Sequence, residues 1–372
     1  MDAHAALAWP DSHQWSVETI DLDPPGPGEV LVRVEAAGLC HSDAHLIRGG
    51  YEQLRRPIVG GHEGAGVVET VGEGVTLCRA GHHVVFSFMP SCGTCRACVA
   101  GLGQLCEVGA QLGEGFQITD RTARHHARGE DLGLFCFAGT FSSHTVVHER
   151  SAVAVDPALP LEELCLLGCA GVTGWGAAVN TAAVRPGDTT VIVGVGGIGA
   201  MALLGARHAG AARVWAVDPL PGKRDAALGL GADDACPSMA EALDPLREQT
   251  AGKLADQVVL CMSDGDGAQL ADAMALLGKR GRAVIVNVHP AGELDTRLSL
   301  RDLQSYEKQI VGCLGGSWPP RQGIARLAEL YRAGRIPLGS LVSRRYRLGE
   351  IADGFADQEA GRNLRGVITD FG

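Results

Sequence analysis

The chain has 372 residues, of which 46% are hydrophobic and 20% are charged. This length corresponds to two or three domains, and the apolar share supplies a large buried core, which excludes a disordered or fibrous protein. The net charge of −11, with no basic run, argues against a nucleic-acid partner.

The N-terminus shows no basic segment followed by an apolar stretch, so no signal peptide is predicted. The sequence contains no uninterrupted run of about 18 or more apolar residues, so no membrane span is predicted. We therefore expect a cytoplasmic protein with no membrane partner. Disulfides are rare in that compartment, so metal binding or catalysis better explains the 12 cysteines.

Short strands separated by turns are expected in the N-terminal part of the chain, which also holds most of the cysteines and histidines. A run rich in Pro and Gly at 23–28 predicts a turn. The predicted strands are 15–20, 29–35, 64–71, 83–86 and 139–147.

Strands alternate with helices after about residue 170. This alternation predicts a parallel sheet that helices cover on both faces. The predicted strands are 189–194, 213–217, 256–261, 282–288 and 309–314, with helices up to about 210, at 222–230 and at 267–277. At the C-terminus we expect helices at 320–333 and 349–360 and a last strand at 365–369.

Four closely spaced cysteines predict a metal site: Cys92, Cys95, Cys98 and Cys106. Four thiolates at this spacing surround one tetrahedral Zn²⁺. Because the set needs no other ligand, we expect a closed structural site that holds a small lobe together. Two disulfides, four unrelated thiols or an iron–sulfur cluster are the alternatives.

A glycine-rich turn follows the first strand of the alternating region, at Gly194, Gly196, Gly197 and Gly199. Strand, glycine turn and helix in this order are typical of dinucleotide binding, because the helix N-terminus binds the pyrophosphate. Asp218 ends the next strand. A carboxylate there accepts hydrogen bonds from the ribose hydroxyls and repels a 2′-phosphate, which predicts NAD rather than NADP. A helix N-cap is the alternative role of Asp218.

Three further segments carry metal-ligand residue types: Gly38–Asp43, Gly61–Glu63 and Leu167–Gly176. Taken singly, such residues are more often core cysteines or surface histidines. Together with the four cysteines and the glycine turn, however, these segments resemble the zinc-dependent medium-chain alcohol dehydrogenases of the long form, over nearly the whole chain.

The resemblance implies an α/β protein with a GroES-like, β-rich catalytic domain and a Rossmann domain built on a doubly wound parallel sheet. It implies a catalytic domain at 1–170 with the zinc lobe at about 90–108, an NAD-binding domain at 171–314, and a return to the catalytic domain at 315–372. It also implies that residues 109–139 form a mobile loop on the substrate side.

By this resemblance, Cys40, His62 and Cys169 hold a catalytic Zn²⁺ and leave one position open for the alcohol. Asp43 would orient His62, and Glu63 would substitute as a transient ligand. Together with the four-cysteine site, this makes two zinc ions per chain.

The resemblance also assigns proton transfer and cofactor contacts. Ser42 would take the alcohol proton and His45 would pass it to solvent through the cofactor ribose, unless His45 is an ordinary loop histidine. A solvated surface role stays open for His41 and Arg365. The implied cofactor contacts beyond the glycine turn and Asp218 are His41, Thr173, Ile198, Lys223, Val286 and Arg365.

Four stretches resemble one branch of this family, the bacterial nicotinoprotein alcohol dehydrogenases that are assayed with a nitroso-aniline electron acceptor. In that branch NAD(H) stays bound between turnovers and a separate carrier re-oxidises it. The chain departs from the branch at Ala170–Gly171, where Gly-Val is usual. The stretches are Trp15–Glu18, His126–Gly129, Gly205–Gly210 and Tyr306–Gln309.

The predicted function is thus NAD-linked interconversion of an alcohol with its aldehyde or ketone. A thiol-adduct formaldehyde dehydrogenase is the alternative, and a non-catalytic reductase-like binding protein is a third reading. We expect a homodimer or homotetramer that pairs through the nucleotide-domain sheet, and an external electron acceptor. The other six cysteines are expected to be small core residues: Cys78, Cys136, Cys165, Cys236, Cys261 and Cys313.

Overall fold

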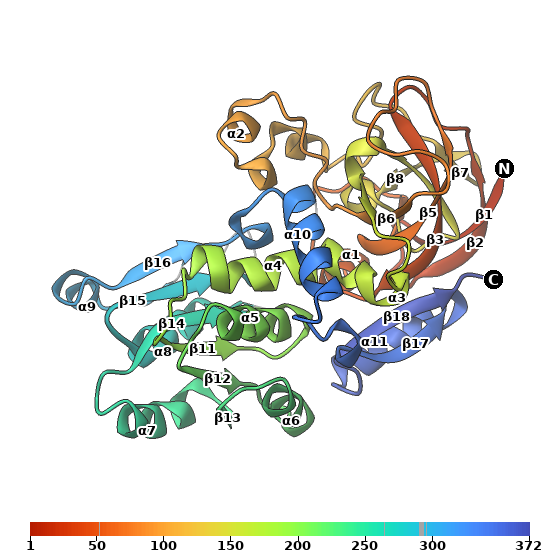
Figure 1. The fold of residues 1–372 in the computed structure, drawn as a ribbon. Coiled ribbons are helices and arrows are strands. Elements are labelled where there is room, and N and C mark those ends of the chain that lie inside the picture. Colours follow the sequence, from red (N-terminus) through yellow and green to blue (C-terminus); the bar gives the residue numbers. More distant parts are fainter. Residues whose placement is uncertain (52, 264, 290–293, 295) are drawn as a thin grey trace. The chain divides into compact units, whose positions relative to one another are not determined.

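The computed structural model describes residues 1–51, 53–263, 265–289, 294 and 296–372 (Figure 1). The chain divides into two compact units. Unit 1 comprises Met1–Cys169 and Trp318–Gly372, and unit 2 comprises Ala170–Ser317. These limits lie close to the expected boundaries after residues 170 and 314.

Unit 1 is built from a closed five-stranded barrel and a seven-stranded sheet. In the barrel, the order is β1 (Asp2–Ala8), β2 (Ser16–Leu22), β7 (His125–Ala127), β8 (Glu130–Leu134) and β4 (Ile58–Val59). In the sheet, it is β10 (Ala152–Val155), β6 (His83–Phe86), β5 (Glu63–Val71), β3 (Glu29–Gly38), β18 (Arg365–Asp370) and β17 (Val342–Arg347), with β9 (His144–His148) also paired to β3.

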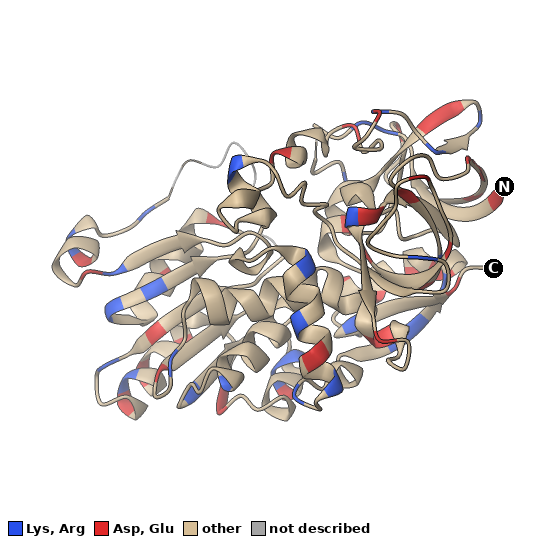
Figure 2. Ribbon diagram, turned by 45° about the horizontal axis from the view of Figure 1, so that its top comes forward, with Lys and Arg blue, Asp and Glu red and all other residues tan. Residues whose placement is uncertain are grey.

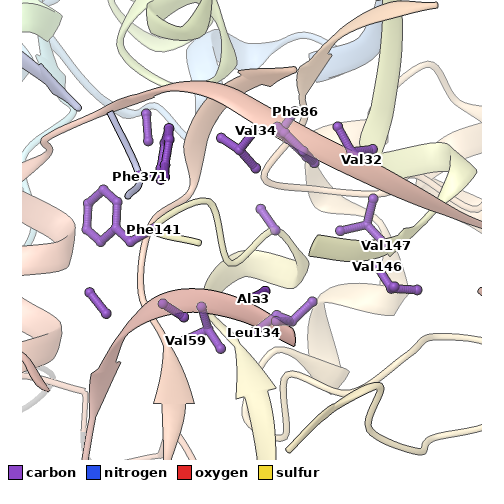
Figure 3. Packing of buried hydrophobic residues seen from close by; sticks show 14 of the residues in the cluster. Ala3, Val32, Val34, Val59, Phe86, Leu134, Phe141, Val146, Val147 and Phe371 are labelled. Carbon is purple, nitrogen blue, oxygen red and sulfur yellow. The ribbon is translucent and has the colours of Figure 1, made fainter. Parts of the chain in front are cut away.

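Barrel and sheet share one hydrophobic core (Figure 3). Val32 and Val34 of β3 pack with Phe86 of β6, and Leu134 of β8 joins the same cluster. Phe86 and Phe141 are fully buried. Burial of such large side chains is the main stabilising term of a β-rich unit of this kind.

The segment 109–139 is not the loop that we expected. His125–Ala127 and Glu130–Leu134 pair as an antiparallel hairpin and complete the barrel. Between them, Arg128 and Gly129 both have positive φ, at 54° and 78°. Two central residues with positive φ are the signature of a type I′ hairpin turn. Strands β1, β4, β10 and β17 of unit 1 were also missed.

The α-helices of unit 1 within the described residues are α1 (His41–Ile47), α2 (Arg96–Val99), α3 (Leu161–Leu164), α10 (Pro320–Arg332) and α11 (Ile351–Glu359). The expected strand at 139–147 is shorter than predicted and begins only at His144. No single helix among the described residues is long and apolar enough to cross a membrane; the bent pair Leu161–Gly168 and Ala170–Thr181 passes that test by length and composition only.

Unit 2 is a six-stranded parallel sheet with the order β13 (Asp234–Cys236), β12 (Arg213–Val217), β11 (Thr189–Val193), β14 (Ala255–Leu260), β15 (Leu277–Ile285) and β16 (Gln309–Gly312). This is the doubly wound order of dinucleotide-binding folds. Its helices are α4 (Ala170–Gly176), α5 (Gly197–His208), α6 (Pro221–Gly229), α7 (Met239–Gln249), α8 (Gly267–Leu276) and α9 (Leu300–Ser305).

Both faces of this sheet are covered. Val191 and Trp215 pack with Leu246 of α7 and Leu270 of α8, whereas Ile192 lies beneath Gly199 of α5. Helices α4 and α5 lie together in Figure 1, and few charged residues mark them in Figure 2. The predicted fold class is therefore confirmed.

Candidate metal and cofactor sites

Strand register brings the first group of expected ligands together. Strands β3 and β5 are antiparallel, and Gly38 at the end of β3 pairs with Glu63 at the start of β5. Cys40 follows Gly38 and His62 precedes Glu63, so both lie beyond the same edge of the sheet. The 3-10 turn Cys165–Gly168 packs against β6, since a Cβ on Gly168 would lie 2.5 Å from the Phe86 carbonyl oxygen. Cys169 comes directly after this turn.

The donor atoms of Cys40, His62 and Cys169 all lie within 4.8 Å of one another. Cys40 and His62 are buried and Cys169 is half-buried. The pKa of Cys40 lies well below its usual value, chiefly because of its interaction with Cys169. The same interaction, together with burial, raises the pKa of Cys169 well above its usual value. Two thiols so close cannot both ionise without a cation. Two sulfurs and one imidazole are a donor set that suits zinc with one position left open.

Asp43 supports this set from the first turn of α1. Its Oδ2 lies 3.0 Å from His62 Nδ1, and its Oδ1 accepts a hydrogen bond of 2.9 Å from the Gly61 N–H. Burial lowers the pKa of His62, but the charges of Asp43, Cys169 and Cys40 outweigh burial and raise that pKa well above its usual value. Because Asp43 faces Nδ1, Nε2 is the nitrogen left for a metal.

Glu63 and Arg365 form a buried ion pair beside the donor set. Strand β18 pairs with β3 at Val367 and Gly38, which brings Arg365 to the same sheet edge. Burial lowers the pKa of Arg365, and the neighbouring Cys40 opposes that shift. A Cβ on Gly38 would lie 2.3 Å from the Glu63 carboxylate, so only glycine leaves room for it. The surface role left open for Arg365 is therefore wrong.

Helix α1 carries the expected proton-transfer residues. Ser42, His45 and His41 are all half-buried on it, so His45 is a helical residue rather than a loop histidine. Tyr51, which sequence reasoning missed, follows α1, and burial raises its pKa to about 12. Its ring lies 6.4 Å from that of His45, centre to centre.

Cys136 is a second residue whose position was misjudged. It is half-buried rather than core, and the charges of His62, Asp43 and Cys40 act on its pKa, which burial raises to about 11. Its neighbour Phe135 lies edge-on to His62, with ring centres 5.3 Å apart. No local motif marks this segment, because the barrel hairpin alone brings it to the donor set.

The four cysteines of the lobe converge as predicted. The sulfurs of Cys92 and Cys98 are 3.9 Å apart, as are those of Cys95 and Cys106. A disulfide needs about 2.05 Å, whereas two sulfurs on a tetrahedral zinc at about 2.3 Å lie roughly 3.8 Å apart. The lobe geometry therefore fits zinc and excludes disulfides among these four residues.

The glycine turn of unit 2 links β11 to α5. Gly194 has φ +87°, and a Cβ on Gly199 would lie 1.9 Å from the Gly194 carbonyl oxygen. Open space surrounds the Cβ position of Gly196, the N-cap of α5, and Gly197 is the first residue of that helix. The turn is thus closed inside and open where a pyrophosphate would approach the helix N-terminus.

Asp218 reaches this turn from the end of β12. Its Oδ2 accepts a hydrogen bond of 2.8 Å from the Val195 N–H, and its Oδ1 one of 3.0 Å from the Leu220 N–H. Leu220, not Asp218, is the N-cap of α6, so the alternative role is wrong. The carboxylate is fixed beside the glycine turn, as ribose recognition requires.

The remaining expected cofactor residues lie in the same unit. Thr173 lies on α4 next to Gly174, where α4 packs closely on α5: a Cβ on Gly174 would lie 2.1 Å from the Ile198 carbonyl oxygen. Lys223 is half-buried on α6. Val286 comes directly after β15, which ends earlier than predicted, and its N–H donates to the Leu260 carbonyl over 3.1 Å.

Of the other cysteines, Cys78, Cys165, Cys236 and Cys261 are buried as expected. Cys313 is half-buried and accepts a hydrogen bond from the Thr181 hydroxyl over 3.2 Å. All 12 cysteines are free of disulfides.

Two family models match the chain. Residues 26–157 match the alcohol dehydrogenase GroES-like domain, and residues 197–331 match the zinc-binding dehydrogenase model. The NDMA-dependent alcohol dehydrogenase of Amycolatopsis methanolica is 45% identical over 99% of both chains. Alcohol dehydrogenase B of Mycobacterium tuberculosis is 42% identical over 99% of this chain and 98% of its own.

Solved structures resemble the fold over its full length. An alcohol dehydrogenase zinc-binding domain protein from Burkholderia ambifaria matches with a TM-score of 0.93 and 34% identity, covering 100% of both chains. Benzyl alcohol dehydrogenase from Acinetobacter calcoaceticus matches with a TM-score of 0.90 and 28% identity, with the same coverage.

Proposed function

Since the chain belongs to the zinc-binding alcohol dehydrogenase family, as its motifs predicted, we propose that it interconverts a primary or secondary alcohol with its aldehyde or ketone, using Zn²⁺ and NAD. The convergence of the Cys40, His62 and Cys169 donor atoms, three ligands that would leave one position of a tetrahedral zinc open, is the observation that carries the proposal. A non-catalytic reductase-like protein would have no need of it. The printed names of the relatives support the same reaction class.

Zinc supplies Lewis-acid polarisation of the alcohol oxygen and NAD supplies the two-electron acceptor when both are bound. The residues of the chain would do the rest. Asp43 holds the His62 ring in place, and Ser42 would accept the alcohol proton, which His45 would pass on. Glu63 would approach as a transient ligand, but its ion pair with Arg365 must first loosen. Asp218 would hold the ribose.

We extend the proposal to the electron acceptor, because the relative from Amycolatopsis is named for its dependence on NDMA. NAD(H) would then stay bound between turnovers and an external carrier would re-oxidise it. His41, Thr173, Ile198, Lys223, Val286 and Arg365 are proposed as further cofactor contacts.

The test begins with purified protein. Metal analysis should find two zinc ions per chain, and denaturation should release NAD(H) into the supernatant. An alcohol panel that includes benzyl alcohol is then assayed with free NAD and with a nitroso-aniline acceptor, beside a hydroxymethyl-thiol adduct. Turnover of the adduct alone would favour the formaldehyde dehydrogenase reading, and absence of zinc or of any turnover would refute the proposal.

We also propose that two copies pair along β16, which with β13 is one of the two edge strands of the unit 2 sheet. An unpaired strand edge is a template for a second chain. Leu300, Tyr306 and Leu314 flank it and are exposed. Leu314→Asp should therefore give monomers in light scattering, whereas Leu228→Asp, at an exposed leucine of α6, should not. Assemblies of unchanged mass would contradict the pairing.

A further inference from the structure

The residue before the metal ligand Cys40 is held at both of its backbone groups. The Leu39 N–H donates to the Gly366 carbonyl oxygen of β18 over 2.9 Å. The Leu39 carbonyl oxygen accepts a hydrogen bond of 3.0 Å from Nε2 of Gln358, a residue of α11 that lies 319 positions further along the chain in the same unit. This carbonyl belongs to the peptide group that joins Leu39 to Cys40, so Gln358 fixes the orientation of that group.

Helix α11 packs closely on Leu39. The Leu39 side chain is fully buried, and its Cδ1 would lie 2.4 Å from a Cβ on Gly354, so only glycine allows this approach. Beside Gln358, the Asp357 carboxylate accepts a hydrogen bond of 2.8 Å from the Tyr346 hydroxyl, which ties the helix to β17. The amide of Gln358 is therefore carried by a helix that packing and hydrogen bonding both hold in place.

The hydrogen bond from Gln358 to Leu39 is shielded from water. Leu39 is 0% and Gln358 5% exposed. A buried carbonyl that loses its donor is costly, because water does not take the donor's place. Without the amide, the peptide group would turn toward another donor, and Cys40 would turn with it.

Cys40 itself lies between a strand and a helix. It is the N-cap of α1, with an extended backbone at φ −119° and ψ 148°, and its side chain makes no capping hydrogen bond. Its own carbonyl accepts a hydrogen bond of 3.0 Å from the Asp43 N–H. We propose that Gln358 is a positioning residue that aims the Cys40 sulfur at the catalytic metal through the Leu39 peptide group. The inference rests on the proposed function, in which Cys40 is one of three zinc ligands.

The expected effect concerns one of the two metal sites. Gln358→Met keeps nearly the length of the side chain but removes the hydrogen-bond donor. Loss of a group that supports a metal ligand without touching the metal costs about 10- to 100-fold in metal affinity. Because Gln358 acts through the backbone of a single ligand, we expect about tenfold weaker binding of the catalytic zinc and no change in the lobe. Gln358→Leu, which is slightly smaller, serves as the second variant if Gln358→Met does not fold.

Gln117 offers a matched control in the same unit. Its Nε2 donates to the Val146 carbonyl oxygen over 2.8 Å, and Gln117 is 5% exposed, as Gln358 is. The two glutamines thus make the same kind of bond at the same depth, but only the carbonyl of Leu39 adjoins a metal ligand. Gln117→Met should lower the melting temperature about as much as Gln358→Met and leave both metal sites as they are in the wild type.

Chelator competition on the metal-loaded protein measures the effect without turnover. The zinc is exchanged for cadmium-113, whose NMR signal moves with the number of thiolate ligands, so the two-cysteine site and the four-cysteine lobe give separate signals. In Gln358→Met the signal of the two-cysteine site should shift and should be lost at about tenfold lower chelator concentration than in the wild type. Both signals should stay unchanged in Gln117→Met.

The outcomes separate this inference from the proposed function. A loss confined to the two-cysteine site of the Gln358 variant supports the inference. Wild-type signals and wild-type chelator sensitivity in that variant overturn it, and so does an equal loss in Gln117→Met, which would reflect general destabilisation. If the wild type itself binds metal only in the lobe, the proposed function fails and the inference fails with it.

Discussion

The Glu63–Arg365 ion pair predicts a large and specific loss of stability. The carboxylate is 0% and the guanidinium side chain 4% exposed, so neither charge reaches water. Glu63→Gln keeps the shape of the side chain but leaves the Arg365 cation buried without its partner. Breaking a buried pair from one side costs about 3–5 kcal/mol, because the remaining charge is uncompensated.

The same strand offers a control with the opposite environment. Glu69 of β5 pairs with Arg33 over 3.2 Å, and both side chains are about two-fifths exposed, at 37% and 44%. Solvent screens such a pair, so Glu69→Gln should cost no more than about 0.5 kcal/mol. The two variants change the same residue type on one strand and differ in burial.

Thermal unfolding of the zinc-loaded protein measures the difference. Glu63→Gln should melt roughly 10 °C below the wild type, and Glu69→Gln within about 2 °C of it. Replacing both partners, as Glu63→Gln with Arg365→Met, should recover part of the loss, because no lone charge is left. Equal melting temperatures for the two single variants, at equal zinc content, would refute the reasoning.

Three further predictions concern the metal lobe, the ribose site and pH. Cys95→Ser should lower the zinc content from two ions to one per chain, whereas Cys236→Ala, at a buried core cysteine, should leave two; unchanged zinc in Cys95→Ser would contradict the lobe assignment. Asp218→Gly should shift the preference from NAD toward NADP by about tenfold or more in binding titrations of the emptied protein; undiminished NAD preference would contradict ribose recognition. Burial lowers the pKa of His125 to about 3, so below about pH 6.5 the unfolded chain takes up a proton that the folded chain refuses, and stability falls as the pH drops toward 3. By pH 5 the free energy of unfolding, measured in urea, should have fallen by about 2 kcal/mol for this reason. His125→Asn should remove this part of the pH dependence. If the wild type and the variant lose stability equally as the pH falls, His125 is not its cause.

Features that depend on neighbouring residues were predictable from the sequence. The four-cysteine lobe is local, since Cys92 to Cys98 occupy one loop and a short helix. The glycine turn is local too, because strand, turn and helix follow directly. Strands β6 and β12 have the predicted bounds, since each is a short, nearly continuous apolar run of the kind that predicts a buried strand.

Features that depend on strand pairing were not predictable without the family resemblance. The hairpin at Arg128 and Gly129 lacks the apolar alternation of an ordinary strand pair, so it was taken for a loop. Tyr51 and Cys136 carry no motif. They come near His45 and the donor set only because α1 and the barrel place them there.

Two members of the open donor set, Cys40 and His62, and the neighbouring Arg365 come from three chain segments that β3 joins. This strand pairs with β5 on one side and β18 on the other, and all three are in register at Gly38. One edge thereby collects a thiol from the end of β3, an imidazole from before β5 and a guanidinium from the start of β18. A one-residue slip in either pairing would turn these side chains to the opposite face. The absence of a side chain at Gly38, which admits the Glu63 carboxylate, therefore supports the geometry of the whole site as directly as the ligands do.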